Sequence, residues 1–360
     1  MSVPSKAGNK EVLLLACNLH DRILGALIGA GAGDAMGAAT EARTTEQIIE
    51  YFGDLVTDFE TPPPDTFGAG NKPGQFTDDF SSAFFLAKSI VDNQGVVDQQ
   101  AVKKALIRWS EHPQFFDRFA GPTTRLAIRR FKGEEIRETK GVQLVARQAT
   151  NGSAMRISPI GLLNPGNLDQ TIADAITVTM ITHDNYLAIS GACAVACAVS
   201  RAVLEDADVY NVLQAALYGA TEGERLGLEV ARDVAGPSVV RRLELAIEIG
   251  LGHGTPEEKM REIGDRVGTG LHISEAVPAA VGLFAANGGD ALGSVIGAVN
   301  VGYDTDTVAT MTGAIAGALK GAAAFPEHFL PTMEAANGLD ISGLAREITA
   351  IAGERLKGGR

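Results

Sequence analysis

The sequence predicts an all-α protein folded as one large domain. Apolar residues recur at intervals of three and four along almost the whole chain, which is the spacing of one face of an α-helix. The alternation of apolar and polar residues that is typical of β-strands is scarce. No long linker or shift in composition divides the 360 residues. We therefore expect an orthogonal bundle of many helices over residues 19–360, preceded by a flexible segment over residues 1–18.

Turn-forming residues separate the expected helices. Pro62-Pro63-Pro64 and the glycine-rich stretch 68–74 divide the first helix from the second, Asn164-Pro165-Gly166 precedes a helix at 168, and Asn287-Gly288-Gly289 precedes one at 290. In chain order, the periodicity predicts helices over residues 19–38, 78–93, 97–110, 122–132, 168–181, 185–205, 209–222, 236–251, 273–286, 290–299, 305–323 and 341–356.

The composition excludes several classes of protein. A net charge of −13, without clustered lysines and arginines, argues against a nucleic-acid-binding surface. Three cysteines are too few for a disulfide framework, and Cys193 and Cys197 are expected to be small buried side chains. The run 12–16 is too short for a secretory signal, and charges interrupt every long apolar stretch. We expect a soluble cytoplasmic protein with no membrane partner.

Glycines repeat every four residues at three places, and in helices such repeats form a stripe along one face. The first is Gly25, Gly29, Gly33 and Gly37; the others are Gly289, Gly293 and Gly297, and Gly313, Gly317 and Gly321. Because glycine destabilises a helix, we expect these stripes to mark places where two helix backbones approach closely. A dinucleotide-binding loop is not supported, since Gly31-Ala32-Gly33 follows no strand and lacks the GxGxxG spacing.

Two acidic clusters at helix starts are the main candidates for chemistry. Thr77-Asp78-Asp79 opens the helix at 78, and Asp304-Thr305-Asp306-Thr307 opens the helix at 305. Each could simply cap its helix, since threonine and aspartate are common in the first turn. Together they supply four carboxylates and hydroxyl groups, the hard oxygen ligands preferred by magnesium, calcium or manganese. We therefore predict that the fold brings the two helix starts together around divalent cations.

Smaller signals accompany these clusters. Asp34 lies within the first glycine stripe, where packed neighbours predict that it caps another helix or holds a loop of the site. Glu41 follows the same helix. Residues 151–156 open with Asn-Gly, which favours a turn, and their amides could face an anion as the next helix begins. A plain loop explains that segment equally well, and His183 is ambiguous.

In their order, these motifs resemble the ADP-ribosylglycohydrolases, the family of dinitrogenase reductase-activating glycohydrolase and of the ADP-ribosylarginine and ADP-ribosylserine hydrolases. The matching pieces extend over about residues 20–322. The resemblance implies an all-α orthogonal bundle with a centre of two Mg²⁺ or Mn²⁺ ions. The metal ligands that it implies are Thr77, Asp78, Asp79, Asp304, Asp306 and Thr307. The substrate-binding residues that it implies are Asn151, Gly152, Ser153, Ala154 and Met155 at the pyrophosphate and distal ribose, and His183 near the adenosine.

The implied reaction is hydrolysis of the bond between ADP-ribose and a protein side chain, which reverses ADP-ribosylation. Asp79 and Asp306 are the candidates for the general base, with Glu41 as a further catalytic candidate that gates or assists substrate. Two alternatives stay open: a hydrolase of small N- or O-ribosides, such as nucleosides or free ADP-ribose derivatives, and a catalytically silent ADP-ribose-binding relative.

Two departures from the family pattern concern the acceptor and leave the expected metal ligands in place. Phe80-Ser81-Ser82-Ala83 follows the first acidic cluster where many relatives have threonine and a methionine-alanine pair. Tyr303 stands where a glycine often precedes the second cluster. We expect the Tyr303 ring to border the substrate pocket and to bear on which acceptor is used: arginine, serine or a smaller leaving group.

Overall fold

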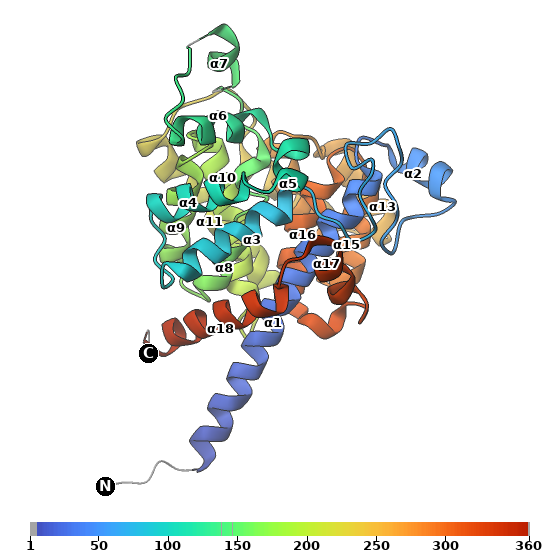
Figure 1. Cartoon of the computed structure of the whole chain (residues 1–360). Coiled ribbons are helices and arrows are strands. Elements are labelled where there is room, and N and C mark those ends of the chain that lie inside the picture. The colour runs from blue at the N-terminus through green and yellow to red at the C-terminus, as the bar shows by residue number, and fades with distance from the viewer. Residues whose placement is uncertain (1–5, 138, 146, 359–360) are drawn as a thin grey trace.

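The protein is all-α, as the sequence predicts. The computed structural model describes residues 6–137, 139–145 and 147–358, with side chains from residue 18 onward (Figure 1). Over these residues it contains eighteen α-helices, two short 3-10 helices and no β-strand. The helices are α1 Lys6–Thr40, α2 Thr45–Phe52, α3 Asp78–Asp92, α4 Gln99–Trp109, α5 Pro113–Phe119, α6 Pro122–Phe131, α7 Lys140–Val145, η1 Asn151–Ser153, α8 Ser158–Leu163, α9 Leu168–Met180, α10 Tyr186–Ala202, α11 Val209–Val230, α12 Val239–Leu251, α13 Pro256–Arg266, α14 Ile273–Ala286, α15 Ala291–Asn300, α16 Thr305–Lys320, η2 Ala322–Ala324, α17 Phe329–Asn337 and α18 Ile341–Gly358.

The fold is centred on α1 and α16, which pack along their glycine stripes. A Cβ atom added to Gly29 would lie 2.1 Å from the carbonyl oxygen of Gly313, and one added to Gly313 would lie 2.0 Å from the carbonyl oxygen of Gly29. Gly33 meets Ala309 in the same way, and Gly37 meets the Cα atom of Asp306 at 2.4 Å. The predicted close approach is therefore confirmed for the first and third stripes, and it fixes α1 against the acidic start of α16.

The second stripe does not form such a contact. Gly289 adopts a left-handed φ of +72° in the turn before α15, outside any helix. The nearest atoms to a Cβ at Gly293 or Gly297 belong to side chains of the preceding turn, chiefly Asp290 and Asn287. The expectation of a backbone-to-backbone seam at this place is wrong, because Gly293 and Gly297 lie against Asp290, the N-cap residue of α15, and Asn287, the C-cap residue of α14.

A continuous apolar core joins the central pair to the other helices. Buried side chains contribute to it from α1 through α18, and α10 is buried along nearly its whole length. Cys193 and Cys197 are buried in α10 against Gly219 and Gly223 of α11, which confirms their expected packing role. The segment Asn18–Thr40 is apolar and long enough to cross a bilayer, yet 94% of its most apolar window is buried inside the protein. Packing against α16 therefore accounts for its composition.

Most of the helices that the sequence analysis did not predict are short. The periodicity missed α2, α5, α7, α8, α13 and α17, which have only 6–11 residues. Capping boxes at Thr44–Gln47 and Thr255–Glu258 were the signals that could have revealed α2 and α13. Helix α11 continues past the predicted end at 222, because Gly223 packs directly against Cys193.

The first helix begins at Lys6, thirteen residues before the predicted domain start at residue 19. Residues 1–5 of the predicted flexible segment, and the side chains of residues 6–17, lie outside the described part of the chain. The domain boundary at residues 18 and 19 stays a prediction.

Candidate metal centre and active site

Asp34 of α1 holds the start of α3. Its carboxylate accepts hydrogen bonds from the backbone N–H groups of Thr77 (2.9 Å) and Phe80 (2.9 Å), and from the Thr77 hydroxyl (2.7 Å). These groups are among the unpaired donors that every helix start presents. The prediction that Asp34 caps a neighbouring helix is therefore confirmed. Because Gly37 of the same helix rests on Asp306, this cap also fixes α3 relative to α16.

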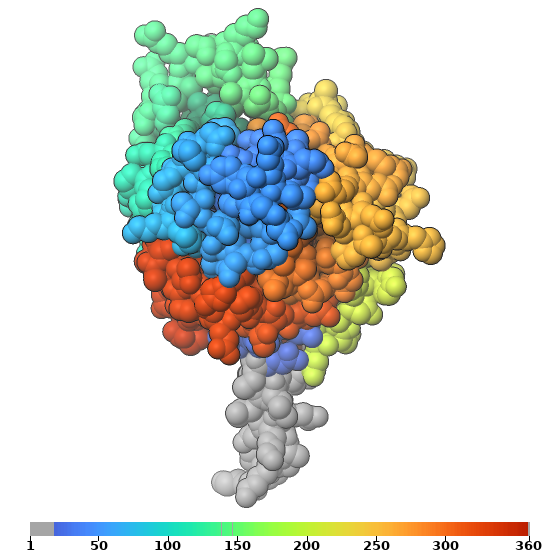
Figure 2. All heavy atoms as spheres, turned by 90° about the vertical axis from the view of Figure 1, so that its right-hand side faces the viewer, coloured from blue at the N-terminus to red at the C-terminus, as the bar shows by residue number. Residues whose placement is uncertain are grey.

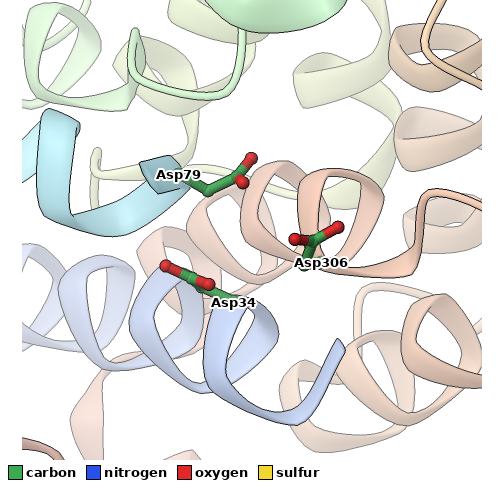
Figure 3. A group of neighbouring side chains, drawn as sticks. All are labelled: Asp34, Asp79 and Asp306. Carbon is green, nitrogen blue, oxygen red and sulfur yellow. The ribbon is translucent and has the colours of Figure 1, made fainter. Parts of the chain in front are cut away.

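Three carboxylates converge where α1, α3 and α16 meet. Oxygen atoms of Asp34, Asp79 and Asp306 all lie within 4.8 Å of one another, and all three residues are buried (Figure 3). Oδ1 of Asp79 is buried without a hydrogen-bond partner among the described residues. Buried carboxylates are unfavourable without a counter-charge, so this donor set fits a divalent cation. The two predicted acidic clusters do meet, and Asp34 joins them.

A second group of carboxylates shares Asp306. Oxygen atoms of Glu41, Asp304 and Asp306 also lie within 4.8 Å of one another. Asp304 is the N-cap residue of α16, and its Oδ2 accepts a hydrogen bond of 2.5 Å from the side-chain amide of Asn151. Glu41 follows α1 directly and is partly buried. The catalytic candidate Glu41 therefore lies beside the predicted ligands, as the sequence leads one to expect.

The other predicted ligands surround these two groups. The Thr77 hydroxyl bonds to Asp34 and lies 3.1 Å from Oδ2 of Asp79. Asp78 and Thr307 line the same pocket as Asp79 and Asp306, but Asp78 belongs to neither of the two carboxylate groups. The assignment of Thr77, Asp78 and Thr307 as ligands stays a prediction.

A pocket of about 400 Å³ opens over the carboxylates. Its floor includes Asp79, Asp304 and Asp306, and one wall runs from the end of α5 to the start of α6, residues 118–124. The opposite wall comes from the predicted substrate segment. Asn151, Gly152 and Met155 line the pocket, whereas Ser153 and Ala154 are buried and do not reach it.

His183 also lines this pocket. Its Nε2 and Nδ1 atoms lie 3.0 Å and 2.8 Å from the hydroxyl groups of Thr150 and Thr182, and its ring packs on Gly152. Burial and the nearby Arg156 lower the His183 pKa to about 3, so the ring is neutral at physiological pH. A neutral ring with both nitrogens engaged suits a packing surface for a ligand better than proton transfer.

Arg156 is a pocket residue that the sequence reasoning did not select. Only 3% of its surface is exposed. It donates hydrogen bonds to the carbonyl oxygen of Gly152 (2.6 Å) and to the Thr124 hydroxyl (3.1 Å). The third guanidinium nitrogen, Nη1, has no hydrogen-bond partner among the described residues. Arg156 therefore ties the substrate segment to α6. The signal for it was an arginine within an otherwise apolar stretch.

Tyr303 lies at the surface and does not line the pocket. Its side chain is 56% exposed, and the ring packs against Gly270. Its backbone adopts a left-handed φ of +68°, which is strained for an aromatic residue. The expectation that its ring borders the pocket is not met by this geometry, because the chain turns sharply before Asp304 and directs the ring outward.

Crowding of buried carboxylates dominates the electrostatics of the site. Burial, opposed by its hydrogen bonds, raises the pKa of Asp34 to about 6, and burial raises that of Asp78 to about 7. Burial and the charges of Asp304 and Asp78 raise the Glu41 pKa to about 8. The pKa values of Asp79 and Asp306 are also raised well above normal by burial and neighbouring carboxylates. The site repels further negative charge and attracts cations.

These shifts predict how the metal-free protein responds to pH. Carboxyl groups with raised pKa values bind protons more tightly in the folded state, so their contribution to stability is complete at low pH and is lost as pH rises through the folded-state values. In EDTA, we expect the thermal midpoint to fall between about pH 5 and pH 8. Saturating Mg²⁺ should weaken this fall, since the ligands bind metal in their ionised form. Calorimetry measures the midpoint. A midpoint that rises with pH in EDTA would contradict the raised pKa values of these buried carboxyl groups.

Buried carboxylates beneath a pocket form a candidate cation site in this all-α fold, and comparison with known proteins gives the family. The family model described as ADP-ribosylglycohydrolase matches residues 16–357. The chain is 31% identical to the uncharacterized protein YegU of Escherichia coli K12, over 92% of this chain and 96% of that protein. It is 27% identical to the ADP-ribosylarginine hydrolase Tri1 of Pseudomonas putida GB-1, over 86% of this chain and 73% of that protein.

A solved structure gives the same picture of the fold. A chain of an ADP-ribosylglycohydrolase-related protein complex superimposes with a TM-score of 0.67 at 24% identity, covering 93% of this chain and 99% of that chain. The protein belongs to the ADP-ribosylglycohydrolase family. The expected fold type and the expected class of enzyme, one that hydrolyses glycosidic bonds of ADP-ribose, are thereby confirmed.

Proposed function

We propose that this protein is a metal-dependent hydrolase that releases ADP-ribose from a modified protein side chain. The observation that carries the proposal is that Asp79 and Asp306, which line the pocket with the substrate segment, meet Asp34 beneath it. Membership of the ADP-ribosylglycohydrolase family supports the reaction class. The printed name of the Tri1 relative, an ADP-ribosylarginine hydrolase, supports a substrate attached to protein.

Two divalent cations, Mg²⁺ or Mn²⁺, suit the donor set. Asp34, Asp79 and Asp306 would hold one ion, and Glu41, Asp304 and Asp306 the other, so that Asp306 serves both. All the donors are hard carboxylate oxygens, which match these ions and not zinc or copper. When bound, such ions polarise oxygen atoms and lower the pKa of coordinated water. The orphaned Oδ1 of Asp79 supports this proposal, because a buried carboxylate oxygen needs a partner.

The remaining pocket residues would bind and orient the substrate. The segment Asn151–Met155 and the start of α6 form facing walls, and Arg156 places one guanidinium between them. In the reaction, a water oxygen bonds to the anomeric carbon, the bond from that carbon to the side-chain atom breaks, and the leaving atom takes a proton. Asp79, Asp306 and Glu41 are the carboxylates placed to move protons between water and the leaving atom.

The test is release of free ADP-ribose from arginine- and serine-ADP-ribosylated peptides with Mg²⁺, with Mn²⁺ and with EDTA. We expect release with either metal and at least about 100-fold slower release in EDTA. Release from nucleosides or free ADP-ribose derivatives alone would favour the small-riboside alternative. Binding of ADP-ribose without hydrolysis of any substrate would favour a silent relative. The cytoplasm, as its location, stays a prediction.

A further inference from the structure

A second cavity adjoins the candidate active site on the other side of Glu41. It has a volume of about 490 Å³ and is lined chiefly by the loop after α1 and by α2, with Glu41, Arg43, Gln47, Glu50, Tyr51 and Asp65 among its residues. Glu41 is the residue that it shares with the pocket over the carboxylates. One side chain therefore stands between the two spaces. We propose that this second cavity is the acceptor subsite and that it selects a cationic acceptor, a guanidinium group; this rests on the proposed hydrolase function.

The charges that line the acceptor subsite favour a cation. Asp65 is paired with Arg43, and Glu41 is assigned above to the second ion, so Glu50 is the lining carboxylate that is left to meet a cation. Glu50 is exposed and has no ion pair among the described residues, and the Asp65 side chain is 74% exposed. A cationic side chain entering the subsite would meet unpaired negative charge, whereas a neutral hydroxyl group would gain little. An acidic acceptor would be repelled.

Arg43 shows how the subsite accommodates a guanidinium. Its Nη2 atom lies 2.6 Å from Oδ1 of Asp65, and its Cζ atom lies 5.2 Å from the centre of the Tyr51 ring. The Arg43 side chain is only 10% exposed, so it forms an inner wall of the cavity. The Tyr51 residue remains 54% exposed. A second guanidinium can therefore stack on Tyr51 and pair with Glu50, using the same two kinds of contact.

Backbone contacts hold the subsite in register with the metal ligands. The N–H group of Ala42 donates to the carbonyl oxygen of Tyr303 (2.7 Å), and the N–H group of Tyr303 donates to that of Arg43 (2.9 Å). Both Ala42 and Tyr303 adopt left-handed backbone conformations, with φ of +61° and +68°. This paired contact fixes the loop that lines the subsite against the loop that carries Asp304. An acceptor bound beside Tyr51 would thus be placed relative to the reacting carbon.

The subsite opens on a face that a protein substrate can reach. Figure 2 shows the segment of about residues 41–75 exposed across the front of this face, beside the segment that contains α13. Gln47, Glu50, Tyr51 and Asp65 are all exposed. An arginine side chain could enter from this face while the polypeptide that carries it stays outside.

The experiment compares two peptides of one sequence that carry ADP-ribose on arginine or on serine. The wild-type protein is expected to show the higher kcat/KM on the arginine-linked peptide. Tyr51→Ala and Glu50→Gln should each lower that value about 5- to 10-fold, chiefly through KM, and change the serine-linked value less than about 2-fold. Glu46→Gln is the matched control, because Glu46 lies on the same helix but pairs with Arg261 of α13. Inhibition by free ADP-ribose, which has no acceptor, should stay unchanged in every variant.

Two kinds of result separate this proposal from the proposed function. If the protein hydrolyses both peptides equally well, or if Tyr51→Ala and Glu50→Gln act no more strongly than Glu46→Gln, the acceptor subsite is wrong and the hydrolase function stands. If the wild-type protein hydrolyses neither peptide with Mg²⁺ or Mn²⁺, both proposals are overturned. A variant that ADP-ribose no longer inhibits is misfolded and does not test the subsite. In that case Glu50→Lys, which reverses the exposed charge, is used, and it should lower kcat/KM on the arginine-linked peptide at least about 10-fold.

Discussion

Replacing Asp306 with alanine is expected to abolish binding of divalent cations and to lower kcat/KM at least about 10³-fold. Asp306 belongs to both groups of converging carboxylates, so its removal leaves each proposed ion with two carboxylates in place of three. In EDTA, the variant should unfold at the same temperature as the wild-type protein or at a higher one. The reason is that Asp306 is buried beside Asp79 and Glu41 and repels them when no cation is present.

Calorimetric titration with Mg²⁺ and Mn²⁺, together with thermal unfolding, measures both effects. Asp265→Ala is the control, since Asp265 is an exposed carboxylate on α13 and should behave as the wild-type protein. Unchanged metal stoichiometry in Asp306→Ala would refute the ligand assignment. A large drop in the EDTA midpoint would show that Asp306 is needed for folding and that the loss of activity has a structural cause.

The sequence identified some of the converging carboxylates and missed other residues of the site. Asp79 and Asp306 could be selected because each lies in the first turn of an apolar helix. A carboxylate at that position is easy to recognise in the sequence. Asp34 was predicted to cap another helix or to hold a loop of the site, and not as a metal ligand. Its proximity to Asp306 depends on how α1 crosses α16, and no local pattern specifies that crossing. Arg156 was overlooked for a similar reason, since its contact with Thr124 depends on how α6 packs against the segment that begins with η1.

Tyr303 illustrates the opposite error. Its position next to Asp304 made it a candidate for the pocket, yet adjacent residues in a tight turn point in different directions. The left-handed φ of Tyr303 directs its ring away from the carboxylates. A sequence shows that a residue is next to a ligand, but the direction of its side chain is set by backbone angles that non-glycine residues seldom adopt. In contrast, the glycine stripe of α1 correctly predicted a close helix contact. Residues four apart lie on the same face of any straight helix, so this prediction did not depend on unusual backbone angles.

Replacing Gly313 with alanine is expected to be strongly destabilising. The new Cβ atom would lie 2.0 Å from the carbonyl oxygen of Gly29 and 2.4 Å from its carbonyl carbon, and neither backbone atom can move without separating α1 from α16. Overpacking of this kind costs about 1–3 kcal/mol, and occasionally more, which exceeds the gain of about 1 kcal/mol in helix propensity. Because the clash is with backbone atoms at 2.0 Å, we take the upper end of this cost, about 3 kcal/mol, and expect a net loss of about 2 kcal/mol in the free energy of unfolding, with more for Gly313→Val.

Separation of α1 from α16 should also disturb the candidate metal centre. Asp306 and Asp34 lie further along the same two helices, so a forced displacement at Gly313 would part their carboxylates and weaken metal binding. Gly353→Ala is the matched control, because Gly353 lies within α18 with no atom within 4 Å of an added Cβ, and there alanine should be neutral or stabilising. Urea unfolding and Mg²⁺ titration of the two variants test this: equal midpoints would mean that α1 and α16 are not as close as the glycine stripes require.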